Sequence, residues 1–189
     1  APYVPPFEGF SFTLENDPSF GMGNTQGTGW KTGSQGGSVN MYADLNLDTY
    51  AKYFLSYQAN GDNELNYFIT TDKYYISETA RLSMSTWVDA SNMKYYVFVS
   101  EDGYEFTTVQ EGVVSSKTAF TVDVDLSGYA GEYYVGIMHV GAESSGGSGN
   151  FYLDDITLYE PEPRAARASA ESSLEIMLEA DTFRLSIFT

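Results

Sequence analysis

Hydrophobic and polar residues alternate with a period of two along much of this chain, a pattern typical of β-strands with one buried face. In the segment from Phe120 to Leu126 the even-numbered positions are apolar, whereas Thr121, Asp123 and Asp125 between them are polar. Similar alternation predicts strands at 7–14, 82–88, 132–140 and 149–160, and weaker patterns predict strands at 39–45, 51–56 and within 60–70. Because turn residues separate these short segments and no long amphipathic helix is visible, the pattern predicts an antiparallel all-β sandwich or barrel.

The clearest hairpin runs from Lys94 to Val109, with Asp102-Gly103 between its two apolar halves. An Asp-Gly pair favours a two-residue type I′ turn. The sequence therefore predicts a tight turn at these two residues.

The strand pattern ends near residue 160, which indicates one domain over residues 1–160. Residues 161–189 begin with the linker-like PEPRAARASA, and we expect a short β-hairpin turning at Ala180-Asp181 or the start of a further module. Within the domain, Glu15 to Ser38 is rich in Gly, Asn, Ser and Thr and is predicted to be a long loop around Trp30.

Two carboxylates fall on strand faces that their neighbours mark as buried. Asp154 alternates with Ile156 and Leu158, and Glu8 alternates with Phe10 and Phe12. A buried carboxylate needs a cation or several N–H donors.

If closure of the sandwich pairs the first and last strands, Glu8 and Asp154 converge, and loop carbonyls can complete a structural Ca²⁺ site. Asp155 points to the opposite face and is the weaker ligand unless the strand bulges there. The alternative is that each acid caps a turn or pairs with a base such as Arg81.

The charge of the chain restricts the classes of partner that it can bind. It has 26 acidic and 9 basic residues, for a formal net charge of -17, which disfavours nucleic acid and anionic membrane surfaces. Calcium suits such a composition, although solubility explains the charge equally well. There is no cysteine, which excludes disulfides and thiolate metal sites, and no apolar run approaches the roughly 18 residues of a membrane span.

An ordered set of segments resembles the cleaved-adhesin domains of gingipains and bacterial haemagglutinins, and the related choice-of-anchor and MAM-like jelly rolls. These segments are FEGF, DNELNYFIT, LSMSTWVDA, YYVFVSEDGYEFTTV, VDLSGYAGEYYVGIMHV and GNFYLDDITL, and the resemblance covers roughly Phe7 to Tyr159. The resemblance implies a jelly-roll β-sandwich with structural calcium held at positions matching Glu8 and the Asp154–Asp155 pair. It also implies a secreted or surface-displayed bacterial protein of several domains. The family's Asp-rich loop is replaced by ENDPSFGMGNTQGTGW, which puts a second calcium site in doubt.

The sequence gives little support to a catalytic function. Jelly-roll glycosidases use two carboxylates across a cleft, but Glu132 directly follows a turn and no second Glu lies mid-strand in a matching context. His139 is the single histidine and no GxSxG motif presents a serine, so a hydrolytic triad is disfavoured and His139 is interpreted as structural.

We therefore expect a non-catalytic adhesion or recognition module that binds a host protein or a glycan. Trp30 and Tyr104 are candidate ligand contacts, with the alternative that Trp30 anchors its loop to the core, and Trp87 is interpreted as a packing residue. The second hypothesis is a structural spacer within a longer surface protein.

Overall fold

The computed structural model describes residues 3–14, 26–35, 38–43, 53–59, 65–89, 93–114, 118–140 and 149–162. In these ranges the regular structure consists of β-strands and one short 3₁₀ turn, η1 (Ser127–Tyr129). The hairpin expected at Ala180-Asp181 lies outside the described residues. None of the described residues forms a helix long and apolar enough to cross a membrane.

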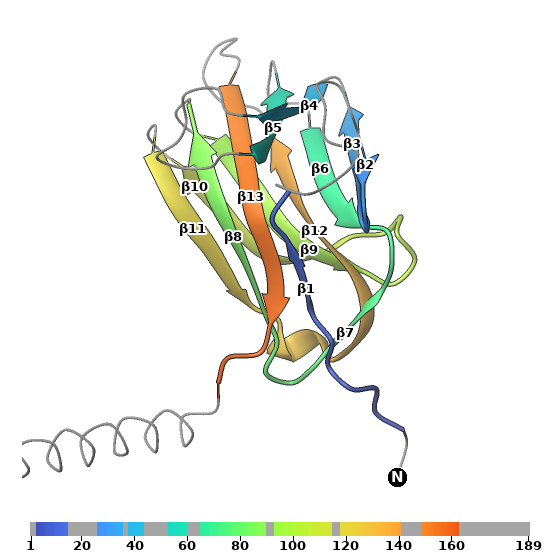
Figure 1. Ribbon diagram of the computed structural model, residues 1–189. Coiled ribbons are helices and arrows are strands. Elements are labelled where there is room, and N and C mark those ends of the chain that lie inside the picture. Colours follow the sequence, from blue (N-terminus) through green and yellow to red (C-terminus); the bar gives the residue numbers. More distant parts are fainter. Residues whose placement is uncertain are drawn as a thin grey trace, which may run out of the picture.

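The strands form two antiparallel sheets stacked as two layers (Figure 1). The first sheet has the order β11-β8-β13-β5-β4, and β1 also pairs with β13. Its strands are β1 (Phe10–Phe12), β4 (Ser38–Ala43), β5 (Tyr53–Ala59), β8 (Arg81–Val88), β11 (Thr118–Asp125) and β13 (Gly149–Tyr159).

The second sheet has the order β10-β9-β12-β6-β3-β2, and β7 pairs with the start of β12. Its strands are β2 (Gln26–Gly27), β3 (Trp30–Gln35), β6 (Leu65–Thr70), β7 (Tyr74–Ile76), β9 (Met93–Ser100), β10 (Thr107–Val114) and β12 (Gly131–Val140). The expected antiparallel β-sandwich is confirmed.

The core lies between the sheets and is built by the predicted alternation. In β8 every second side chain, from Leu82 to Val88, is buried, and in β11 Val122 and Val124 are buried while Asp123 and Asp125 face solvent. The largest side chains that are almost fully buried are Trp30, Phe68, Phe98, Phe151, Ile69, Ile76, Leu82 and Met84. Burial of this apolar area is the main contribution to the stability of the fold.

Two local predictions are wrong. The segment expected to be one long loop contains β2 and β3, because Trp30 and its neighbours pair with β6 and Trp30 buries its ring in the core. The β9–β10 hairpin exists, but residues 101–106 connect it in place of a two-residue turn. The Asp102 carboxylate closes this loop by accepting the backbone N–H groups of Tyr104 (2.8 Å) and Glu105 (2.9 Å), and these bonds lower the pKa of Asp102.

The first and last strands are direct neighbours, as the closure argument requires. In Figure 1 the short β1 lies along the lower part of β13. Phe10 pairs with Leu158 and Phe12 pairs with Ile156. This register decides which residues near the two ends of the domain meet.

Candidate functional site

The register separates the two carboxylates expected to share a calcium ion. Since Phe10 pairs with Leu158, Glu8 continues toward Glu160, whereas Asp154 lies in the opposite direction along β13. Glu8 is exposed and lines a groove of about 480 Å³ together with Asp72 and Glu132. Asp154 is only 6% exposed, as expected. Glu8 and Asp154 therefore do not converge.

A β-bulge explains the local geometry of the two aspartates. The pairing of β13 with β8 shifts between Asp154 and Thr157, and Asp155 adopts a left-handed backbone conformation with φ 48°. The Asp154 Oδ1 atom accepts the backbone N–H of Asp155 at 2.8 Å.

The bulge reverses the side-chain alternation along the strand. Phe151 and Leu153 face the core before it, Ile156 and Leu158 face the core after it, and Tyr152 faces outward. Asp154 pairs with Ser85 of β8, which lies between two buried residues, so Asp154 shares the outer face of Tyr152 although it is buried. The expectation that Asp154 shares the core face of Ile156 and Leu158 is therefore wrong.

The described residues do not form a ready calcium site. Asp155 is exposed, and its Oδ2 accepts only a long 3.5 Å hydrogen bond from Ser85. Among the residues that the structure describes, no group of three His, Asp or Glu side chains could hold a metal ion. A structural calcium site stays a prediction, but Glu8 and Asp154 cannot bind the same ion.

The two predicted ligand-contact residues have opposite environments. Trp30 is 0% exposed and stacks on Phe68 with ring centroids 5.9 Å apart, so it cannot contact a ligand and instead anchors β3 to the core. Tyr104 is 88% exposed in the loop between β9 and β10. Its role in binding stays a prediction.

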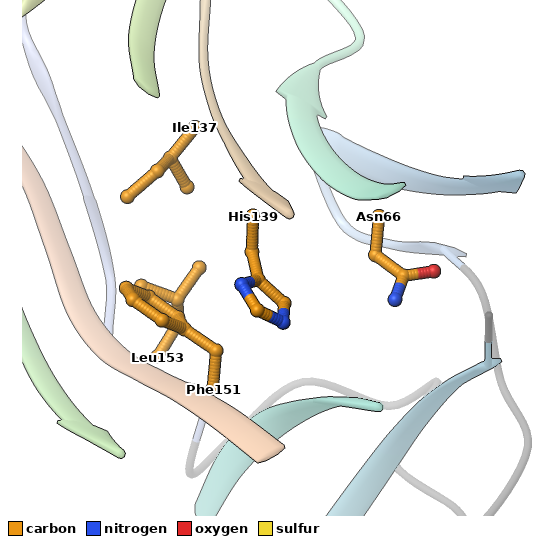
Figure 2. A pocket seen from close by; sticks show the side chains of 5 residues that line it. All are labelled: Asn66, Ile137, His139, Phe151 and Leu153. Atoms are coloured by element: carbon orange, nitrogen blue, oxygen red, sulfur yellow. The ribbon is translucent and has the colours of Figure 1, made fainter. Parts of the chain in front are cut away.

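The buried gap around His139 is part of the core (Figure 2). His139 is 2% exposed, stacks on Phe151 at 5.2 Å, and is lined on its other sides by Asn66, Ile137 and Leu153. Its Nδ1 lies 3.3 Å from the carbonyl oxygen of Lys94, and its Nε2 has no hydrogen-bond partner in the described part of the chain. Burial lowers the pKa of His139 to about 4, so the ring is neutral at pH 7 and packs in the core. This agrees with a structural histidine, but the expectation that such a residue has all its hydrogen bonds satisfied is wrong for Nε2.

The outer face of the second sheet carries an aromatic surface that the sequence analysis missed. One row of paired residues crosses five strands on this face, and we call it the aromatic row. From β10 to β3 it consists of Glu111, Tyr96, Met138, Tyr67 and Gly33. Tyr96, Met138 and Tyr67 are partly exposed at its centre.

Two glycines allow aromatic rings to lie against this sheet. A Cβ on Gly33 would lie 2.1 Å from the Tyr67 ring, and a Cβ on Gly136 would lie 2.4 Å from the Phe98 ring. Each ring therefore occupies the space above a neighbouring strand where a side chain would otherwise project.

Phe106 borders the aromatic row on one side. Its ring stacks on Phe98 with centroids 4.2 Å apart and meets Tyr67 edge-on at 5.8 Å. Phe98 is 0% exposed beneath it, whereas Phe106 remains 36% exposed. The β9–β10 loop thus supplies an apolar wall beside the partly exposed tyrosines.

The other side of the row opens into a hollow of about 320 Å³ over β9 and β10. It is lined by Lys94, Tyr96, Glu111, Gly112 and Val113. An aromatic ring with hydroxyl, ammonium and carboxylate groups around it can stack on an apolar surface and hydrogen-bond to polar groups at its edge. The arrangement suits a ligand that is flat and rich in hydroxyl groups.

A sequence signal for this face existed but was ambiguous. In KYYVFVS the alternation places Tyr95 and Val97 on one face and Tyr96 and Phe98 on the other, so both faces are apolar. Only the register of the sheet shows that Tyr96 and Tyr67 lie in one row. Trp87, expected to be a packing residue, is partly exposed on the first sheet beside Tyr152, with centroids 4.7 Å apart.

Comparison with known proteins gives fold relatives only. No protein-family model matches the sequence, and no curated protein matches it. The structure is similar to the K1 cleaved adhesin domain of Lys-gingipain from Porphyromonas gingivalis W83, with TM-score 0.55 and 17% identity over 82% of this chain and 99% of that one.

Two carbohydrate-binding modules share the same architecture. A variant of the family 29 module CBM29-2 has TM-score 0.51 and 10% identity over 79% of this chain and 90% of that one. A carbohydrate-binding module of the β-sandwich superfamily, described as promiscuous in specificity, has TM-score 0.55 and 13% identity over 79% of this chain and 61% of that one. At these identities the likeness shows the fold, and the protein is a β-sandwich of the type found in cleaved-adhesin domains and carbohydrate-binding modules.

Proposed function

We propose that this protein is a non-catalytic binding module that holds a carbohydrate on the aromatic row of its second sheet. The observation that carries the proposal is the placing of two partly exposed tyrosines, Tyr96 and Tyr67, in one row across a rigid sheet. Aromatic rings stack on the apolar faces of sugar rings, while Glu111 and Lys94 lie where sugar hydroxyls can hydrogen-bond to them. The fold relatives described as carbohydrate-binding modules support this choice.

A binding role agrees better with this face than a catalytic role does. Glu132 is exposed at the beginning of β12, and Glu111 is exposed near the opposite end of the sheet. A glycosidase needs two carboxyl groups roughly 5–10 Å apart on either side of the scissile bond. Glu111 is the one acid among the residues that form the aromatic row and line its hollow, so the row itself has no such pair.

We further propose that the module acts outside the cell, as an adhesion unit of a secreted or surface protein. The fold shared with a gingipain adhesin domain supports this. Two alternatives compete with glycan binding. The module binds a host protein instead, or it is a structural spacer that binds no ligand.

We retain calcium in the proposal, with Asp154, the one buried carboxylate among the residues that the structure describes, as a ligand. The test is metal analysis of protein purified without chelator, followed by melting in EDTA. We expect bound calcium and a lower melting temperature in EDTA, an effect that Asp154→Asn abolishes and Glu8→Gln preserves.

A glycan array tests the proposed function. The intact chain should bind at least one class of glycan, and the double variant Tyr67→Ala/Tyr96→Ala should lose at least 10-fold in affinity because both stacking rings are removed. Tyr3→Ala is the matched control, since Tyr3 is 84% exposed, lies before β1 and lines the groove of Glu8 instead of the hollow beside the row. Absence of all glycan binding, or binding that the double variant retains, would contradict the proposal.

A further inference from the structure

We infer that the ligand of the aromatic row is an extended, neutral, β-linked oligosaccharide of three or more sugars, lying across the strands. This inference rests on the proposed function and specifies the class of glycan. It follows from the spacing of the row, the leaning of its two tyrosines and the charge of the molecule.

The spacing of the row sets a minimum ligand length. Tyr96 on β9 and Tyr67 on β6 are separated by β12, which carries Met138 between them. Two interstrand steps place the Cβ atoms of the tyrosines roughly 10 Å apart. One pyranose ring is shorter than this distance and cannot contact both tyrosines.

The tyrosines lean in opposite directions, which lengthens the contact surface further. The Tyr67 ring lies over Gly33 on β3, and Tyr96 lines the hollow formed with Glu111 and Val113 on β10. A ligand that contacts both rings must therefore pass over Met138 and continue on either side of it.

The shape of the row selects the linkage. Phe106 rises along one side of the row, so a chain that curls away from its axis loses contact with one of the tyrosines. Equatorial β-linkages keep a glycan chain flat and extended, and alternate sugars present the same face. Axial α-linkages coil the chain, so that two distant tyrosines cannot both be covered.

The charge of the molecule selects a neutral chain. The formal net charge is -17, and Glu111 lies at one end of the row, so sulfated or uronic-acid glycans are repelled. Lys94 beside Glu111 provides a donor for hydroxyl oxygens. Neutral hydroxyl-rich chains meet both requirements.

Titration calorimetry with sugar ladders tests the inference on the intact chain. The probes are neutral β-1,4-linked gluco-, xylo- and manno-oligosaccharides of two to six sugars, with malto-oligosaccharides of equal length as the α-linked series. We expect at least one β-1,4 series to gain at least 10-fold in affinity from the disaccharide to the tetrasaccharide, and the malto series to bind at least 10-fold more weakly at every length.

Single variants show which residues cause the gain in affinity with oligosaccharide length. Tyr67→Ala and Tyr96→Ala should each remove most of the gain with length, and Tyr3→Ala should preserve it, with the fold of each checked by circular dichroism. Affinity that stops increasing at the disaccharide, or equal binding of the malto series, would overturn this inference while leaving carbohydrate binding intact. If no member of either series binds and the array is also blank, the proposed function itself is wrong.

Discussion

His139 shows how one buried side chain links stability to pH. The ring lies between the sheets against Phe151, and burial lowers its pKa from the ordinary 6.5 to about 4. The unfolded chain therefore binds a proton below pH 6.5 that the folded chain does not bind until about pH 4. The contribution of the neutral His139 ring to the free energy of unfolding is therefore complete above pH 6.5 and is lost as the pH falls toward 4.

We predict that the free energy of unfolding falls by about 2 kcal/mol between pH 7 and pH 5 on account of this histidine. Urea unfolding at the two pH values measures the change. In His139→Leu the difference between the two values should shrink, because the variant has no group that titrates there. Equal pH dependence in both proteins would show that His139 is not the source.

The two aspartates of the bulge show the limit of alternation as a guide to single residues. Alternation with Ile156 and Leu158 predicted that Asp154 is buried on their face. Asp154 is buried, but on the opposite face, because a bulge adds one residue between them and no local composition marks its place. A shift of one residue reverses the face of every side chain on one side of it.

At the scale of elements, β12 and its neighbours pack more closely at Gly136 than an ordinary side chain allows. A Cβ there would lie 2.3 Å from the carbonyl oxygen of Phe68 on β6 and 2.4 Å from the Phe98 ring on β9. The glycine thus permits Phe98 to lie flat beneath Phe106, and the apolar wall beside the aromatic row depends on it.

We predict that Gly136→Ala lowers the free energy of unfolding by about 1–3 kcal/mol, since the methyl group forces β12 and β6 apart or displaces the Phe98 ring. Gly128→Ala is the matched control, because no atom lies within 4 Å of the Cβ added there. Chemical denaturation of both variants makes the comparison. Equal stability of the two would show that the sheet yields at Gly136 without cost.

Most strands were predictable from the sequence because burial repeats every second residue, as in β8 and β11. The strands β2 and β3 were missed because their glycines and polar residues resemble a loop, and they become strands only because β3 pairs with β6 and β2 pairs with β3. The aromatic row depends on the register of four strand pairings, β10 with β9, β9 with β12, β12 with β6 and β6 with β3. Composition contains no such information, so Tyr67 and Tyr96 could not be assigned to one surface beforehand.

The net charge of -17 acts on the whole molecule. Folding brings these charges closer together, so their mutual repulsion opposes the compact state. Salt weakens this repulsion, since the Debye length falls from about 30 Å at 0.01 M to about 8 Å at 0.15 M.

We predict that raising NaCl from 0.01 M to 0.15 M at pH 7 increases the melting temperature by about 2–4 °C, equivalent to about 1 kcal/mol for a domain of this size. The gain should shrink at pH 4.5, where carboxylates begin to take up protons. Affinity for a neutral glycan should change less than twofold over the same range of salt. A melting temperature that falls with salt would mean that attractive ion pairs dominate.

The pairing of β1 with β13 also determines how the domain bears mechanical load. Phe10, where β1 begins, lies opposite Leu158, near the end of β13. A tensile force along the chain, applied just before β1 and just after β13, therefore separates the two strands one residue pair at a time. This is peeling, in which hydrogen bonds break in succession at low force, in contrast to shearing, in which they break together. We expect β1 to detach first under tension and so to lengthen the chain between the two points of force. The second sheet, with its aromatic row, should keep its strand pairing.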